Sequence, residues 1–330
     1  MSFEHKFKKQ LDKDLDDMFY ELFNNATGKN HGIEQIKASF ANFGKTDDMY
    51  KIVTHNWSVD PNNKLMQKNL AIYKKELEDA YNTLEIAAKD NPHIVMDPTF
   101  NTGVHLRFNF DKVRHWKWRF SCNVKIEKIN LFITHLLNGL KIIIKCPKCK
   151  GKLDRKTFVC EQCGHTVAFE FKTWYYGNCE LNSLIRRDKL VFYLPNEELI
   201  GDIYHIMKKL KKYLDPDTPK FLKEIVPGCG FGPDKPNELV AAKREEYFLN
   251  LGGSFTERFC LIIVKYLHKH IVELQEEIQK NFIAVKDEKG LYKYLRTVFL
   301  KVKLDVLNDK QVKEYIRIVS KLHEELEHMT

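Results

Sequence analysis

Apolar residues recur at steps of three and four near both ends of the chain. Residues 3–22 and 66–88 each carry one apolar face at this spacing, which predicts two amphipathic helices in the N-terminal region. We expect three further helices near the C-terminus, at 255–282, 289–302 and 310–328. The segment 90–98 holds two prolines and an asparagine, and we interpret it as a linker.

The middle of the chain alternates polar and apolar residues instead, with the period of half-buried strands. The predicted strands are 105–110, 116–126, 140–145, 167–175 and 189–194. Two helices are expected among them, at 126–140 and 197–214. Strands in the middle and helices at both ends predict an α+β fold, with a central antiparallel sheet flanked by N- and C-terminal helices.

These patterns divide the chain into three predicted regions. Residues 1–95 form an N-terminal helical region, residues 96–280 the α+β domain, and residues 281–330 the C-terminal helices. A glycine-rich segment at 227–233 lacks the Gly-Lys-Ser/Thr of a phosphate-binding loop. We expect it to be a structural loop that follows a helix, with a turn at a substrate's edge as the alternative.

Composition favours a soluble globular protein. The chain is 43% hydrophobic and 30% charged, without low-complexity runs. Its longest apolar run, near 260–264, is far too short to cross a bilayer, and the charged N-terminus lacks the apolar core of a signal peptide. Eight cysteines with metal-ligand spacing among them fit a reducing compartment. We therefore expect a cytoplasmic protein without a membrane partner.

The net charge of +9 favours an anionic partner. Nucleic acid, a phosphorylated peptide, an acidic peptide and a membrane surface all satisfy this condition, and charge alone does not choose among them.

Four cysteines are spaced as ligands of one metal ion. They form two Cys-x-x-Cys pairs, Cys146 with Cys149 and Cys160 with Cys163, separated by ten residues. Zinc favours four thiolates at tetrahedral corners, and a site filled by four protein ligands leaves no position for a substrate. The spacing predicts a structural Zn²⁺ in a zinc ribbon at 144–166, inserted between two strands. Four unrelated thiols or a disulfide pair is the alternative.

Cationic residues on the predicted strands are the second chemical feature. Alternation places Arg107 on the opposite side of its strand from Leu106 and Phe108. If the polar faces of neighbouring strands coincide, then Arg107, Lys172 and Arg187 converge on one surface. Guanidinium groups bind phosphate through two hydrogen bonds, and a lysine with a lowered pKa can accept a proton. The alternative is that these are ordinary solvent-facing side chains.

Six segments together resemble the HopA-type effector family of bacterial type III secretion. They are HLRFNF, WKWRFSCNV, FEFKTWY, RRDKLVFYLP, TPKFLKEIVPGCGFGPDKP and GGSFTERFCLIIVKYL, within about residues 100–270. Relatives of that domain serve as lyases in class V lanthipeptide biosynthesis. Two features depart from the family pattern: the usual Ser-Phe-Gly reads Ser-Phe-Thr at 254–256, and the zinc ribbon is an insertion.

The resemblance implies an α+β domain that eliminates phosphate from phosphoserine or phosphothreonine in a peptide. Lys172 is then the candidate base for the substrate α-proton, Asp188 orients an arginine, and Tyr193 assists proton transfer. The candidate phosphate ligands, which stabilise the leaving group, are Arg107, Arg187 and Arg258.

Two other kinds of function fit the same residues. One is a non-enzymatic effector or defence-related binding module whose basic surface and ribbon contact protein or nucleic acid. Nucleic acid is the weaker expectation, since Phe158 is the only aromatic residue between the cysteine pairs and single strands need aromatic stacking. The other is a structural partner of a protein kinase or peptide synthetase.

Overall fold

The computed structural model describes residues 2–27, 64–89, 91–97, 103–112, 116–143, 145–179, 186–234, 259–260, 262–267, 269–270 and 288–328. The chain divides into two compact units. The helical unit comprises Met1–Ser58 and Leu239–Lys321, and the sheet unit comprises Val59–Glu238 and Leu322–Thr330. The three regions predicted from the sequence remain a prediction. They were defined by changes in the pattern of apolar and polar residues, whereas these two units are defined by contacts between residues.

The helical unit contains α1 (Phe3–Thr27), α10 (Glu288–Asn308) and most of α11 (Lys310–His328). The apolar stripe predicted for the first helix is buried, with Phe7 and Leu11 fully inaccessible to solvent. Phe7 packs edge-on against Tyr315 with ring centroids 5.3 Å apart. Helices are therefore present at the predicted positions 3–22, 289–302 and 310–328, whereas most of the helix predicted at 255–282 lies outside the described residues. The described residues between 259 and 270 are helical as well.

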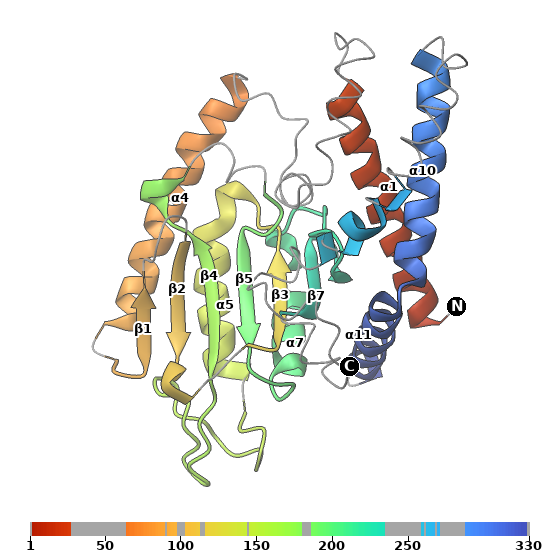
Figure 1. Cartoon of the computed structure of the whole chain (residues 1–330). Coiled ribbons are helices and arrows are strands. Elements are labelled where there is room, and N and C mark those ends of the chain that lie inside the picture. The colour runs from red at the N-terminus through yellow and green to blue at the C-terminus, as the bar shows by residue number, and fades with distance from the viewer. Residues whose placement is uncertain are drawn as a thin grey trace. The chain divides into compact units, whose positions relative to one another are not determined.

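The sheet unit is built on seven antiparallel strands in the order β1-β2-β4-β5-β3-β7-β6 (Figure 1). The strands are β1 (Ile94–Asp97), β2 (Gly103–Phe108), β3 (Trp118–Cys122), β4 (Phe169–Trp174), β5 (Leu190–Leu194), β6 (Lys223–Val226) and β7 (Cys229–Pro233). Helices α4 (Lys64–Ala88), α5 (Ile129–Ile143) and α7 (Ile200–Leu210) lie behind the sheet in that view. The predicted α+β fold with a central antiparallel sheet is confirmed.

One face of the sheet is apolar and forms the core of this unit. Phe169 of β4 stacks on Phe192 of β5 at a centroid distance of 5.4 Å, and both side chains are fully buried. Cys122 of β3 lies 3.7 Å from the sulfur of Met207, which places α7 against this face. Burial of large aromatic side chains on one face stabilises the sheet against its helices and leaves the opposite face to polar residues.

Three local predictions were wrong. The apolar run expected as a strand at 140–145 continues α5 to Ile143, because Leu136, Leu137 and Leu140 are buried at helical spacing. The ribbon therefore follows a helix and precedes β4, and it does not join two strands. The expected linker at 90–98 contains strand β1.

The third wrong prediction concerns 227–233, which forms a turn and strand β7 instead of a loop after a helix. Gly228 has a φ of +83° in the turn between β6 and β7, a conformation that glycine adopts without strain. Gly230 faces Leu222 so closely that a side chain would not fit, since a Cβ there would lie 2.6 Å from the Leu222 Cβ. Gly228 thus serves the turn and Gly230 serves close packing.

No helix in the described ranges is both long and apolar enough to cross a membrane.

Replacing Gly228 by alanine tests the turn between β6 and β7. A Cβ at this position would lie 2.0 Å from the carbonyl oxygen of Asp215, so Gly228→Ala should lower the free energy of unfolding by about 3 kcal/mol or more. Gly164→Ala is the matched control, because Gly164 also has a positive φ but no atom within 4 Å of a Cβ. It should cost about 1 kcal/mol. Equal losses in urea unfolding would contradict the steric argument.

Candidate functional site

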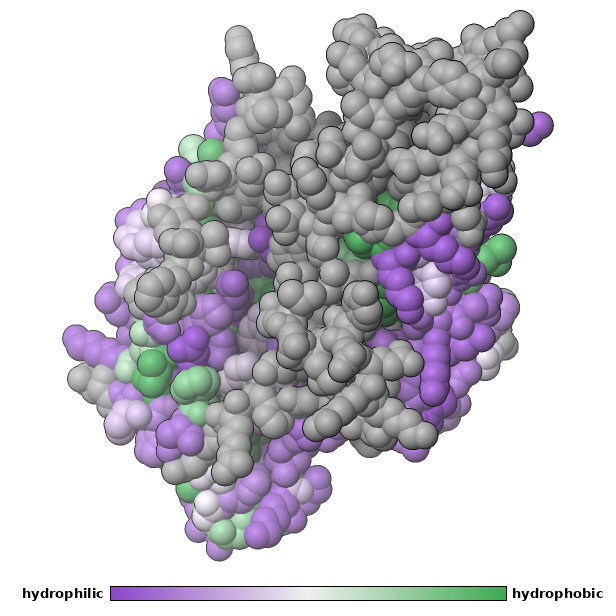
Figure 2. All heavy atoms as spheres, in the orientation of Figure 1, coloured by the Kyte–Doolittle hydropathy of each residue, from purple (hydrophilic) through white to green (hydrophobic). Residues whose placement is uncertain are grey.

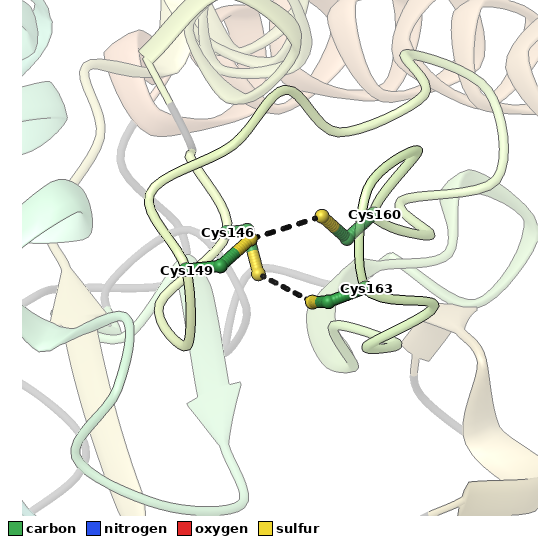
Figure 3. Close-up of side chains that lie close together, drawn as sticks. All are labelled: Cys146, Cys149, Cys160 and Cys163. Carbon is green, nitrogen blue, oxygen red and sulfur yellow. Dashed lines mark hydrogen bonds between the residues drawn. The ribbon is translucent and has the colours of Figure 1, made fainter.

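Four cysteine side chains meet at one point in the ribbon. The sulfur atoms of Cys146, Cys149, Cys160 and Cys163 all lie within 4.8 Å of one another, and Figure 3 shows the four side chains pointing together. The distance is 3.6 Å between Cys146 and Cys163 and 3.4 Å between Cys149 and Cys160. These separations suit four ligands of a single metal ion. No other such group occurs among the residues that the structure describes.

The two cysteine pairs sit in turns with the same hydrogen bonds. The amide of Lys150 donates to the carbonyl of Cys146, and the amide of Gly164 donates to that of Cys160. Lys150 and Gly164 occupy equivalent positions, and both have a positive φ, 62° and 68°. Backbone N–H groups of Cys163 and then of Gln162 help hold the pKa of the Cys160 thiol low, at about 6. For Cys149 the backbone N–H of Gly151 acts in the same direction, but hydrogen bonds with the thiols of Cys160 and Cys163 outweigh it and raise the pKa of Cys149 to about 12. Binding of a metal ion by all four sulfur atoms requires the thiolate form and releases these protons.

Phe158 fixes the ribbon to the core of the sheet unit. Its ring is 3% exposed and packs edge-on against Phe108 and Phe169, with centroids 5.4 and 5.0 Å away. The side-chain amide of Asn109 donates to the carbonyl oxygens of Thr157 and Val167, at 2.8 Å each. The only aromatic residue between the cysteine pairs is therefore a buried anchor and is not available to stack on bases.

The face of the sheet opposite the apolar core carries two rows of side chains that cross several strands, and all but Val191 are polar. The pairing register sets the first row as Arg107, Glu170, Tyr193 and Arg119, on β2, β4, β5 and β3. The second row runs from His105 on β2 through Lys172 on β4 to Val191 and Ser121. We call these residues and the Arg186–Asp188 pair at the start of β5 the charged face.

Glu170 is the centre of a hydrogen-bonded network on the charged face. This carboxylate is 3% exposed and bonds both the Nδ1 atom of His105 and the Nε atom of Arg107, the latter at 3.2 Å. The Nη1 atom of Arg107 donates to Asp97 at 2.8 Å. A buried carboxylate that bonds both side chains satisfies its hydrogen-bonding capacity and holds both partners in fixed positions.

Lys172 lies beside this network without a hydrogen bond of its own among the described residues. Its side chain passes over Gly103, where a Cβ would lie 2.6 Å from Cε of the lysine. Burial lowers the pKa of Lys172, with Asp188 acting in the opposite direction and Arg186 in the same direction. A half-buried lysine with a lowered pKa has a larger neutral fraction and can accept a proton.

Arg186 and Asp188 form an ion pair next to Lys172. The Nε and Nη2 atoms of Arg186 donate to the two carboxylate oxygens at 2.8 and 2.9 Å. The guanidinium also lies over the ring of Trp174, 4.3 Å from its centroid, and Nζ of Lys172 is 5.8 Å from the same ring. Burial raises the pKa of Asp188, but Arg186 outweighs this effect and the pKa lies below its ordinary value. The carboxylate of Asp188 therefore holds the guanidinium of Arg186 in place.

Tyr193 stays protonated on the charged face. Burial raises its pKa far above the ordinary value, and the nearby Asp234 acts in the same direction. Arg119, next to Tyr193 in the first row, has Nη1 3.8 Å from Asp234. A tyrosine in this state can donate a proton or a hydrogen bond, but it is a poor base at neutral pH.

The structure brings some of the predicted site residues together and not others. Arg107, Lys172 and Tyr193 share the charged face, and Asp188 is among the charges that act on Lys172. Arg187 instead pairs with the carboxylate of Asp217. Arg258 lies outside the described residues.

Sequence reasoning missed His105 and Glu170 as site residues. Both could be recognised as polar residues on the same side of their predicted strands as Arg107 and Lys172, respectively. Their contact depends on the register between β2 and β4, which places Arg107 opposite Glu170 and His105 opposite Lys172. Alternation within one strand does not contain that information.

No family model matches the chain, and no curated protein matches it significantly. The resemblance to the HopA-type family therefore stays a prediction. Arguments about function rest on the side chains of the cysteine cluster and the charged face.

The pH dependence of stability tests whether the ammonium group of Lys189, directly before β5, is buried in the folded protein. Burial lowers its pKa from 10.5 to about 8, and its Nζ atom donates to Asn123. Between those pH values the unfolded chain binds a proton that the folded chain releases, so stability rises with pH across this window. Relative to Lys189→Met, which does not titrate, the protein should gain roughly 3 kcal/mol between pH 7.5 and 10.5.

Urea unfolding of both proteins at several pH values measures the effect. Lys211→Met removes an exposed lysine and serves as the matched control, with no change in relative stability across the same range. A constant difference between the protein and Lys189→Met would contradict the burial of the ammonium group.

Proposed function

We propose that the charged face binds a phosphorylated serine or threonine of a peptide and removes its phosphate by elimination. The observation that carries the proposal is Lys172, a half-buried lysine with a lowered pKa and no hydrogen bond within the described ranges. The resemblance to the HopA-type family implies the same reaction. The substrate is a phosphorylated peptide, supplied by a kinase or synthetase partner.

The reaction breaks the Cα–H and Cβ–O bonds of the substrate and forms an N–H bond on Lys172 and a π bond between Cα and Cβ. Neutral Lys172 takes the proton from the substrate Cα, and the electron pair of that C–H bond forms a double bond between Cα and Cβ. The Cβ–O bond breaks, and its electrons leave with the phosphate group. The products are a dehydroamino acid and inorganic phosphate, and no oxidant or water is consumed.

The leaving phosphate needs positive charge and a proton. Arg107 supplies the charge: two of its nitrogens bond Glu170 and Asp97, and Nη2 makes no bond within the described part of the chain. His105 supplies the proton from Nε2 when both ring nitrogens are protonated: it lies directly opposite Lys172, and Nδ1 keeps its hydrogen bond to Glu170 as the Nε2–H bond breaks and an O–H bond forms on the phosphate. Tyr193 keeps its own proton and assists by hydrogen bonding.

The candidates Arg187 and Arg258 contribute less support. Arg187 must exchange Asp217 for the phosphate before it can act, and Arg258 lies outside the described residues.

Incubation with a phosphothreonine peptide tests the lyase proposal. The peptide should lose the mass of phosphoric acid, and the product should add a thiol such as β-mercaptoethanol across its new double bond. Lys172→Arg keeps a long side chain that ends in nitrogen, but its guanidinium stays protonated and cannot accept the proton, so the reaction should slow by about a hundredfold or more. Lys211→Arg, at an exposed position, is the matched control.

Two outcomes would contradict the proposal. Release of phosphate with recovery of an intact threonine would indicate hydrolysis in place of elimination. Full activity of Lys172→Arg would show that another group removes the α-proton.

We also propose that the metal of the cysteine cluster is a structural zinc ion. Four thiolates are the ligand set that zinc prefers, and a tetrahedron with Zn–S distances near 2.3 Å has sulfur atoms about 3.8 Å apart. The closest observed sulfur pairs, at 3.4 and 3.6 Å, fit this geometry. All four positions are taken by protein ligands, so the ion would stabilise the ribbon and take no part in the reaction. The eight cysteines are all free, in keeping with a cytoplasmic location.

Metal analysis of the purified protein should give one zinc per chain. Cys163→Ser should lose most of the metal and make the ribbon sensitive to protease, because a structural zinc site supplies folding energy directly. Cys260→Ala, a buried cysteine of the helical unit, should keep its full zinc content. A different metal, or full zinc occupancy in Cys163→Ser, would contradict the assignment.

A further inference from the structure

The ribbon concentrates positive charge on its surface. Of the 22 residues at 145–166, six are lysine or arginine and two are acidic. All six cations are exposed. We call them the ribbon cations: Lys145, Lys148, Lys150, Lys152, Arg155 and Lys156. Figure 2 shows the end of the sheet unit where the ribbon projects as mainly hydrophilic.

Most of this charge has no ion-pair partner among the residues that the structure describes. In the described part of the chain, the only ion pair of a ribbon cation joins Lys152 to Glu161, at 2.8 Å. The carboxylate of Asp154 instead accepts hydrogen bonds from the amides of Lys156 and Thr157 within its own turn. Binding of a divalent metal by four thiolates would remove two positive charges, which leaves the ribbon cationic.

The side chains of the ribbon distinguish among possible anionic partners. A protein interface needs an apolar centre, but the ribbon's Leu153 and Phe158 are buried. Binding of single strands relies on exposed aromatic rings, and the only ring between the cysteine pairs is that of Phe158. The phosphates of a duplex require only accessible cations at the spacing of its backbone.

We propose that the ribbon cations bind the phosphate backbone of a nucleic acid duplex, without reading its base sequence. The ribbon is suited to this role because Phe158 and the hydrogen bonds of Asn109 fix it to the sheet. Cations on a rigid support lose little conformational freedom when they bind. This binding goes beyond the proposed lyase activity and does not depend on it.

Fluorescence anisotropy with a labelled DNA duplex of mixed sequence tests the proposal at several salt concentrations. The protein should bind with a dissociation constant on the order of 10⁻⁶–10⁻⁴ M, and affinity should fall steeply with salt. The test variant carries Lys148→Gln, Arg155→Gln and Lys156→Gln. It should bind about tenfold or more weakly, and the slope of log K against log salt should decrease by roughly 2–3.

The control variant removes the same charge at a different place. It carries Lys209→Gln, Lys211→Gln and Lys212→Gln, at the C-terminal end of α7 and in the turn that follows this helix. The ribbon contacts the other end, because His165 of the ribbon pairs with Glu198 in the segment before α7. The control should keep both affinity and salt slope. Zinc content and thermal unfolding should be unchanged in both variants, since all six side chains lack ion pairs within the described residues.

Each of the following four outcomes would contradict the proposal. Absence of binding at low salt would exclude the duplex, and equal losses in both variants would indicate attraction by net charge alone. Tighter binding of a single strand of the same length would exclude duplex selection. Stronger ribbon-dependent binding of polyglutamate would indicate an acidic protein partner. Phosphopeptide elimination is measured separately, so failure of either proposal leaves the other to be judged by its own assay.

Discussion

The antiparallel pairing of β2 with β4 determines which side chains lie on the charged face and which lie in the apolar core. In this register Arg107 lies opposite Glu170 and His105 opposite Lys172, while Leu106 lies opposite Phe171 on the other face. A shift of one residue would turn charged groups into the core and aromatic rings toward the polar side. The aromatic packing behind the sheet therefore fixes the register on which the chemistry in front of it depends.

On the charged face some basic side chains are paired with a carboxylate, whereas Lys172 has no such partner among the described residues. Arg107 and His105 share a buried carboxylate, and Arg186 has a bidentate partner in Asp188. Removing charged groups from water is expensive unless they are paired, which explains these contacts as a condition of folding. Lys172 has a cation–π contact with Trp174 but no carboxylate at hydrogen-bonding distance in the described part of the chain. Burial lowers the pKa of Lys172 and so enlarges the neutral fraction of its amine. This difference distinguishes Lys172, the candidate base, from the paired residues around it.

Local patterns in the sequence predicted the parts of the protein that local physics determines. The two Cys-x-x-Cys pairs implied a common metal site, because each spacing closes within a single turn. Alternation predicted β2 and β4 and the faces of their residues. Apolar runs were ambiguous: 140–145 was predicted as a strand but continues α5. The strand at 229–233 was missed because its glycines serve close packing against Leu222.

Contacts between distant segments could not be predicted in the same way. Arg186 and Arg187 are neighbours in the sequence, but one pairs with Asp188 beside Lys172 and the other with Asp217. The register between β2 and β4 decides contacts such as that of Arg107 with Glu170, and packing at the strand ends supports this pairing. Phe158 of the ribbon packs on Phe108 and Phe169, which are opposite one another in β2 and β4. Arg107 and Glu170 follow directly in the same pair of strands. The metal cluster and the charged face are thus connected through three aromatic rings, and an ordered ribbon supports the register that positions Glu170.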